Sequence, residues 1–206
     1  MTISTDILQP NTRVVVFDLD GTLYAKGGMV WRMMLALPCH WRKMLAERQT
    51  RKQLRGQWIG EQFYQKYFDE MGKNGPLSPA KAERWYQEVY MPQMVALIHR
   101  HYPLASWVMP FIEACQERDL RLVVLSDYGH THEKLQALGI DPAQFDWVVS
   151  APELGGLKPA PELMQQVAGK MQVQPSECLV IGDRMDTDGE MAKAVGAAFY
   201  WINDNK

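Results

Sequence analysis

The sequence predicts an α/β protein with a doubly wound parallel sheet at its core and an all-helical insert after the first strand. Residues 13–18 and 120–125 are short, valine-rich apolar runs, which is typical of strands buried on both faces of a sheet. Strand and helix patterns alternate from residue 106 onward, as in parallel sheets with crossover helices. Residues 29–100 are rich in Met, Leu, Arg, Gln and Glu and carry only helical patterns.

The individual elements follow from local patterns along the chain. Pro38 and the segment 72–76 are expected to interrupt the helices of the insert, and Ser78 before Pro79 is typical of a helix start. Strands are expected at residues 13–18, 120–125, 145–150, 178–181 and 197–201. Helices are expected at residues 29–37, 39–54, 59–71, 79–99, 106–118, 130–138, 161–171 and 187–195.

The insert is also rich in aromatic residues. Aromatic side chains at helical spacing usually pack against one another, so we expect them to form the core of this helical unit. The residues concerned are Trp31, Trp41, Trp58, Phe63, Tyr64, Tyr67, Phe68, Trp85 and Tyr86.

Two domains are predicted because the helical segment interrupts the sheet directly after its first strand. Residues 1–24 and 101–206 are expected to form the α/β core, and residues 25–100 the helical domain. In sheets of this kind, ligands bind beyond the carboxyl ends of the strands. The insert is therefore expected to stand over the ligand-binding edge.

Composition argues against several classes of protein. The chain has 206 residues and a formal net charge of −2, which does not suggest a nucleic-acid binder. No apolar stretch reaches about 18 residues, so we expect no membrane span, and the first ten residues do not have the pattern of a signal peptide. Cys39, Cys115 and Cys178 are far apart, which favours reduced thiols in a cytoplasmic protein over a disulfide or a zinc site. A monomer and a homodimer are both compatible with the sequence.

Charge is distributed unevenly along the chain. Residues 25–105 contain 13 Lys and Arg against 6 Asp and Glu, a net of +7, and the remaining residues contain 9 against 18, a net of −9. Two interpretations are open. The asymmetry reflects either two ordinary solvated surfaces or a basic lid that attracts an anion towards an acidic site.

Polar side chains follow several of the expected strands. Asp18, Ser126 and Asp183 stand at strand ends, and Lys158 lies in the loop after the third strand. Asp20 lies two residues after Asp18, so both carboxylates can point to the same side of an extended chain. Neighbouring carboxylates are costly unless a cation joins them or one is protonated. The pair therefore predicts a divalent metal site, an acid/base pair, or both.

These five residues suit phosphoryl transfer. The reaction needs an in-line nucleophile, a proton donor for the leaving oxygen and positive charge around the phosphoryl oxygens. A carboxylate can act as that nucleophile and form an aspartyl-phosphate. Carboxylate oxygens suit Mg²⁺ better than zinc. A lysine supplies positive charge, and a serine hydroxyl can donate to a phosphoryl oxygen.

The same residues carry a resemblance to a known family. Residues 18–22 (DLDGT), Ser126, Lys158 and residues 182–188 (GDRMDTD) resemble, in order, the four motifs of the haloacid dehalogenase-like (HAD) hydrolase superfamily. The motifs span most of the chain outside the insert. The resemblance implies a Rossmann-like core with a helical cap, as in the helical-cap (C1) phosphatases of the superfamily.

The resemblance also implies a role for each matching residue. Asp18 would be the nucleophile and a Mg²⁺ ligand, and Asp20 the general acid/base with its backbone carbonyl on the metal. Ser126 and Lys158 would hold the phosphoryl oxygens. Asp183 would complete the protein ligands of the metal.

Three further residues of these motifs receive supporting interpretations. Asp188 would orient the metal ligands without binding the metal itself, although direct or water-mediated contact with the metal is left open. The hydroxyl of Thr22 would fix the loop that contains Thr22. Asp186 is expected to be a solvated carboxylate at a helix start. Dehalogenase members resemble this fold but lack the second aspartate, so Asp20 favours a phosphatase or phosphotransferase.

Substrate contacts are expected from two places. The segment 54–58 resembles the cap loop that sets substrate choice in related members, where Arg55 and Gln57 could reach the leaving group and Trp58 could stack on a ring. A helix break with a solvated arginine and a packed tryptophan is the alternative. Asp127 departs from the family pattern and is expected either to bind a substrate hydroxyl or amine, or to cap the helix near His130.

The predicted function is that of a Mg²⁺-dependent phosphatase that hydrolyses a small anionic phosphorylated metabolite through an aspartyl-phosphate on Asp18. A helical cap usually implies such a substrate, closed off from water during chemistry. Two alternatives stay open: a phosphomutase or phosphotransferase of the same family, and a non-enzymatic ligand-binding member. Phosphoglycolate, a nucleoside monophosphate and a sugar phosphate are all compatible with the sequence.

Overall fold

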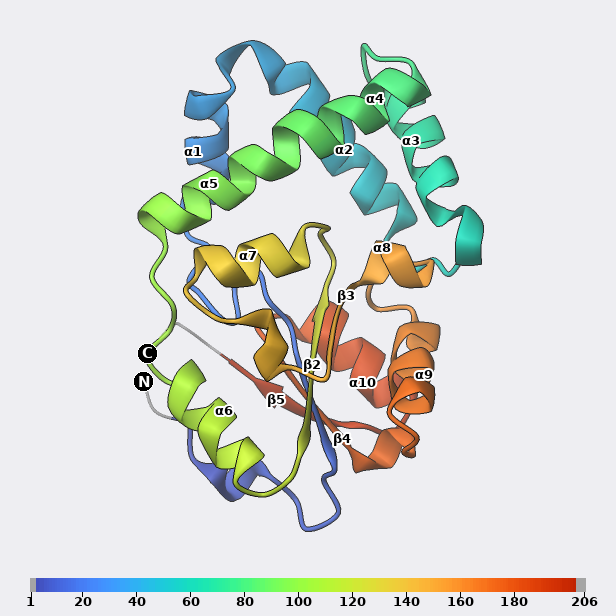
Figure 1. The fold of residues 1–206 in the computed structure, drawn as a ribbon. Helices are drawn as coiled ribbons and strands as arrows, with labels where there is room; N and C mark the ends of the chain where they lie inside the picture. The colour runs from blue at the N-terminus through green and yellow to red at the C-terminus, as the bar shows by residue number, and fades with distance from the viewer. Residues whose placement is uncertain (1–2, 203–206) are drawn as a thin grey trace.

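A computed structural model describes residues 3–202 and shows a five-stranded parallel sheet in the order β3-β2-β1-β4-β5 (Figure 1). The strands are β1 Val14–Phe17, β2 Arg121–Ser126, β3 Trp147–Ser150, β4 Cys178–Gly182 and β5 Ala198–Trp201. β1 lies in the middle, where Val16 pairs with Val123 on one side and with Val180 on the other. The chain adds β2 and β3 on one side and then crosses to add β4 and β5 on the other. The doubly wound sheet is therefore confirmed.

Helices cover both faces of the sheet. The helices are α1 Met29–Ala36, α2 Trp41–Leu54, α3 Phe63–Asn74, α4 Pro79–Trp85, α5 Met91–His101, α6 Val108–Gln116, α7 Thr131–Ala137, α8 Ala151–Leu154, α9 Pro161–Lys170 and α10 Glu190–Ala194. Because side chains alternate along a strand, Val15 and Phe17 belong to the apolar layer that contains α6 and α7, and Val14 and Val16 to the layer that contains α9 and α10. The strands are nearly continuous apolar runs because both of their faces are buried under helices.

Helices α1 to α5 lie beyond the carboxyl ends of the strands, as Figure 1 shows. In this region α5 packs on α7, and α3 packs on α8. The division into a core of residues 1–24 and 101–206 and a cap of residues 25–100 stays a prediction, and residues 1–2 and 203–206 lie outside the described part. No helix within residues 3–202 combines the length and the apolar character needed to cross a membrane.

The helices of the insert depart from the expected boundaries in two places. The break predicted at residues 72–76 is found, but it begins later than expected, because α3 continues to Asn74 and the chain becomes extended only at Gly75. Gly72 serves packing, since a Cβ at this position would lie 3.1 Å from the Pro79 ring at the start of α4. The predicted helix 79–99 contains a π-helical turn at Tyr86–Tyr90 between α4 and α5. Pro92 explains an irregularity there, because it has no N–H to continue the α-helical hydrogen bonds.

The aromatic side chains of the insert divide into three groups, one of which consists of the partly buried Trp58 and Tyr64, which pack against the apolar core. The prediction of a packed core is confirmed for the buried residues Phe63, Tyr67, Phe68, Trp85 and Tyr86. It is wrong for two tryptophans of α1 and α2, since Trp31 is 68% exposed and Trp41 is 55% exposed. Both line a cavity between the insert and the sheet.

Candidate active site

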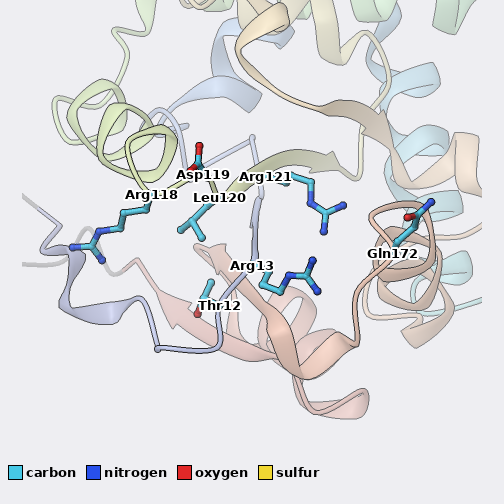
Figure 2. A pocket seen from close by; sticks show the side chains of 7 residues that line it. All are labelled: Thr12, Arg13, Arg118, Asp119, Leu120, Arg121 and Gln172. Atoms are coloured by element: carbon cyan, nitrogen blue, oxygen red, sulfur yellow. The ribbon is translucent and has the colours of Figure 1, made fainter.

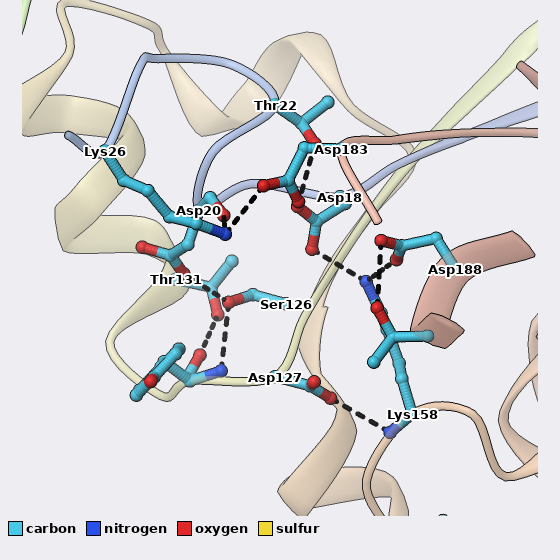
Figure 3. A network of polar contacts seen from close by, with 12 residues as sticks. Asp18, Asp20, Thr22, Lys26, Ser126, Asp127, Thr131, Lys158, Asp183 and Asp188 are labelled. Atoms are coloured by element: carbon cyan, nitrogen blue, oxygen red, sulfur yellow. Dashed lines mark hydrogen bonds and ion pairs between the residues drawn. The ribbon is translucent and has the colours of Figure 1, made fainter. Parts of the chain in front are cut away.

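The carboxyl edge of the sheet brings the predicted catalytic residues together (Figure 3). Asp18 follows β1, Ser126 ends β2, and Asp183 follows β4. Lys158 reaches the same place from the loop before α9. Neighbouring parallel strands end at one edge, so residues far apart in sequence meet there.

Lys158 lies between two carboxylates. Its Nζ is 2.8 Å from Asp18 Oδ1 and 2.7 Å from Asp188 Oδ1, and the Thr22 hydroxyl donates to the other oxygen of Asp18 at 2.8 Å. Burial alone would lower the pKa of Lys158, but the neighbouring Asp18 and Asp188 carboxylates raise it above its usual value. The ammonium therefore stays charged beside Asp18.

Asp20 accepts three hydrogen bonds through its carboxylate. The donors are the Tyr24 hydroxyl at 2.6 Å, the Lys134 ammonium at 2.7 Å and the Ser126 hydroxyl at 3.0 Å. Burial alone would raise the pKa of Asp20, but the charge of Lys134 and these hydrogen bonds together hold it below its usual value. The arrangement favours the ionised form of Asp20.

Lys134 is a site residue that sequence reasoning missed. It is fully buried on α7, and its ammonium also lies 4.9 Å from the centre of the Tyr128 ring. The sequence did contain a signal. Thr131, Lys134, Leu135 and Leu138 follow the i, i+3, i+4, i+7 spacing of a buried helix face, which places this lysine among apolar positions.

An acidic cluster at the same edge is compatible with a divalent metal ion. Asp18, Asp183 and Asp188 each offer a carboxylate oxygen, and these oxygens lie within 4.8 Å of one another. Burial raises the pKa of Asp183, and the neighbouring Lys26 offsets only part of this effect. Burial likewise raises the pKa of Asp188, where Lys158 offsets only part of it. Added positive charge would therefore stabilise the cluster, and its hard oxygen ligands are compatible with a divalent metal.

A lysine already contacts two oxygens at this place. The Lys26 ammonium donates to the backbone carbonyl of Asp20 at 2.6 Å and to the Asp183 carboxylate at 2.8 Å (Figure 3). That carbonyl is the backbone metal ligand implied by the family resemblance. Gly21 allows the close approach, because it adopts a left-handed φ of 103° and a Cβ there would collide with Asp183.

Ser126 and Asp127 hold the surrounding loops. The Ser126 hydroxyl donates to Asp20 and accepts from the backbone N–H of Tyr128 at 3.1 Å. The Asp127 carboxylate accepts from the backbone N–H of Lys158 at 3.0 Å. The expectation that Asp127 caps the helix near His130 is therefore wrong, since its carboxylate is directed towards the Lys158 loop.

The expected substrate residues of the insert lie elsewhere. Arg55 forms an ion pair with Asp186 at 2.6 Å, and the Gln57 amide donates to the Gln53 carbonyl at 2.7 Å. Trp58 forms a backbone bridge with Gly156. None of the three lines the cavity described below, so their roles in substrate binding stay predictions.

Asp186 is more than the solvated carboxylate expected from the sequence. It also pairs with Arg184 at 2.7 Å, and hydrogen bonds from Arg184 and Arg55 lower the pKa of Asp186 to about 2 against the effect of partial burial. Its contact with Arg55 joins α2 to the motif that follows β4.

A cavity of about 650 Å³ opens from the acidic edge towards the insert. Asp18, Asp20, Asp127, Asp183 and Asp188 line one end, and side chains of α1 and α2 line the other. A second cavity of about 370 Å³ lies near the amino ends of β1 and β2, where Arg13 and Arg121 line it (Figure 2). None of these aspartates lines it. The larger cavity is therefore the candidate substrate site.

Fold and site together define an α/β protein with an aspartate–lysine centre beneath a helical insert. The model of the haloacid dehalogenase-like hydrolase family matches residues 12–196, which is most of the chain. The protein belongs to this family.

Individual relatives agree with this assignment. Human N-acylneuraminate-9-phosphatase is 31% identical over 109 residues, which cover 52% of this chain and 43% of that protein. Phosphoserine phosphatase from Thermus thermophilus is 24% identical over 150 residues, which cover 71% of this chain and 56% of that protein. The chain thus spans about half the length of these curated relatives.

A solved structure shows the same fold. The predicted phosphoglycolate phosphatase from Haemophilus somnus superposes with a TM-score of 0.65 and 21% identity, covering 96% of this chain and 90% of that one. The Rossmann-like fold of the family is therefore shown over nearly the whole chain.

Proposed function

We propose that the protein is a Mg²⁺-dependent phosphatase that hydrolyses a small phosphorylated metabolite through an aspartyl-phosphate on Asp18. The observation that supports this most strongly is the ion pair between the Asp18 carboxylate and the Lys158 ammonium, at 2.8 Å. A second buried carboxylate, that of Asp20, lies two residues further along the chain. Two relatives named as phosphatases favour the same activity.

In the first half of the proposed reaction, an Asp18 oxygen attacks phosphorus and the bond to the leaving oxygen breaks. Asp20, entering this step protonated, gives its proton to the leaving oxygen. In the second half, Asp20 takes a proton from a water molecule that attacks the phosphorus. The bond between phosphorus and the Asp18 oxygen breaks, which regenerates the Asp18 carboxylate and releases inorganic phosphate. Lys158 offsets negative charge on the phosphoryl oxygens in both halves.

Asp18, Asp183 and Asp188 would hold the metal ion together with the backbone carbonyl of Asp20. When bound, the ion supplies positive charge that stabilises the phosphoryl group and reduces repulsion among the carboxylates. Lys26 now donates to two of these oxygens, so its side chain must move when the ion binds.

Phosphate release from a panel of phosphorylated metabolites and a generic aryl phosphate tests the proposal. With Mg²⁺ we expect turnover that chelation abolishes and that Asp18→Asn reduces by about 1,000-fold or more. Asp119→Asn is the matched control, because Asp119 is exposed, distant from the site and in a left-handed conformation that asparagine also adopts. Absence of phosphate release from the whole panel would contradict the proposal. Interconversion of isomers without release would indicate a mutase.

A further inference from the structure

The large cavity has two chemically different ends. Its acidic end contains the proposed nucleophile and the acidic cluster. Its other end is formed by the insert, chiefly by α1 and the first half of α2. The apolar residues of this wall are Met29, Val30, Trp31, Met33, Met34, Trp41, Met44, Leu45, Tyr90 and Met94.

Several large side chains of this wall are exposed to solvent. Besides Trp31 and Trp41, this group contains Val30, Met34 and Leu45. Single exposed apolar residues are ordinary on protein surfaces, but a contiguous group marks a binding surface. Here the group lies in the same cavity as Asp18, so the wall and the reacting carboxylate share one space.

The basic residues of the insert mostly do not line this wall. Arg51 pairs with Glu47, Arg55 pairs with Asp186, and Lys66 and Lys73 pair with Glu70. From the insert, only Lys26, Glu47 and Arg48 bring charge to the cavity. Most of the positive charge that suggested a basic lid therefore lies outside the cavity, and the greater part of the wall is apolar.

We propose that the substrate is a phosphomonoester of an apolar alcohol, with its phosphate at Asp18 and its hydrocarbon group against the wall formed by α1 and α2. The inference rests on the phosphatase function proposed above. The cavity of about 650 Å³ falls within the range of about 300–1,000 Å³ typical of small-molecule sites. Methionine and tryptophan side chains suit a flexible hydrocarbon, because methionine adapts its shape and tryptophan offers a large apolar face.

A series of alkyl phosphates tests the inference while the phosphate end stays constant. We would measure kcat/KM for ethyl, butyl, hexyl and octyl phosphate, each below its critical micelle concentration. A fully buried methylene group favours binding by roughly fourfold. With about half of the six added methylene groups buried, we expect roughly a 60-fold rise from ethyl to octyl phosphate.

Variants of α1 locate the effect. We expect each of the variants Trp31→Ser and Met34→Ser to lower kcat/KM for octyl phosphate by about tenfold. The ratio of kcat/KM for octyl phosphate to kcat/KM for ethyl phosphate should fall as well. Leu35→Ser is the matched control, since Leu35 is 78% exposed on the same helix but does not line the cavity. It should leave the chain-length dependence unchanged. Trp31 is itself exposed, so loss of folding is not expected to obscure the result.

A binding measurement separates failure of this inference from failure of the proposed function. Calorimetric titration with octylphosphonate and ethylphosphonate, which are not hydrolysed, should show tighter binding of the longer compound. Turnover of hydrophilic phosphates without any chain-length dependence would overturn the inference and leave the phosphatase proposal intact. Tighter binding of octylphosphonate without turnover of any phosphate would support the apolar site and contradict the phosphatase. Cosedimentation with phosphatidylcholine vesicles, together with no chain-length dependence, would instead assign the wall to a membrane surface.

Discussion

The ion pair between Asp20 and Lys134 determines the protonation of the proposed acid/base. Lys134 is fully buried, and the oxygen it contacts lies 2.7 Å away. A buried charge without a partner is strongly unfavourable, so each member of the pair stabilises the ionised form of the other. Ionised Asp20 is the form that takes a proton from water in the second half of the proposed reaction. The first half requires the protonated form, which the same lysine disfavours.

Lys134→Met should therefore move the pH dependence of the reaction. Without the ammonium, the pKa of Asp20 rises, and the protonated form that the first half requires persists to higher pH. We expect the alkaline limb of the pH profile of kcat/KM to move upward by about one unit. Lys193→Met on α10 is the control, since Lys193 is exposed and outside the cavity. A profile that coincides with that of the unmodified protein would show that Lys134 has no influence on the titration of Asp20.

At the scale of elements, the end of β4 and the turn after it depend on one glycine. The π-helical turn Met185–Gly189 brings Asp188 back over the end of the strand, where its carboxylate contacts Lys158. A Cβ at Gly182 would lie 2.5 Å from the Asp188 carboxylate carbon. The close approach of turn and strand is therefore possible only with glycine at this position.

Gly182→Ala is expected to displace Asp188 and to lower the free energy of unfolding by about 1–3 kcal/mol, as overpacking does elsewhere. Thermal unfolding followed by circular dichroism measures the change. Gly169→Ala provides the comparison, because Gly169 lies inside α9 and, apart from its neighbours and the backbone of its own helix, no atom of the described residues comes within 4 Å of the place that an added methyl group would occupy. Alanine there should raise stability by roughly 0.5–1 kcal/mol. Equal stability of the two variants would show that Asp188 accommodates the methyl group.

At the scale of the whole molecule, Arg51 joins the insert to the sheet. Its guanidinium donates to Glu47 at 2.8 Å and to the backbone carbonyl of Asp127 at 2.6 Å. It also lies 3.8 Å from the centre of the Tyr128 ring. These contacts connect α2 to the loop after β2, directly beside the acidic edge of the cavity. Glu47 is buried and depends on Arg51 for its only ion pair within the described residues.

Arg51→Met should destabilise the protein by about 3–5 kcal/mol, because it leaves the Glu47 carboxylate buried without a cation. Chemical denaturation measures the loss. The double variant Glu47→Gln/Arg51→Met removes both charges and is expected to recover a substantial part of the stability. If the double variant were as unstable as the single one, the loss would come from packing on Tyr128 and not from the unpaired charge.

Much of this protein could be predicted from the sequence because the relevant signals are local. Short apolar runs that end in polar residues identify the strands and their functional ends, since adjacent parallel strands bring those ends to one edge. Asp18, Asp20, Lys158 and Asp183 were placed in this way, and the structure brings all four together. The order of elements likewise determined that a helical segment would follow the first strand.

Only the tertiary structure decided which surfaces face one another. A helical period predicts that one face of a helix is apolar, but the same pattern is produced by a packed core and by the wall of an open cavity. For this reason Trp31 and Trp41 could not be separated in the sequence from the buried Trp85. Lys134 was missed for a related reason, since its carboxylate partner lies 114 positions away and no local pattern relates the two residues. The residues of the proposed reaction are thus encoded at the strand ends, whereas the shape and polarity of the candidate substrate cavity depend on long-range packing.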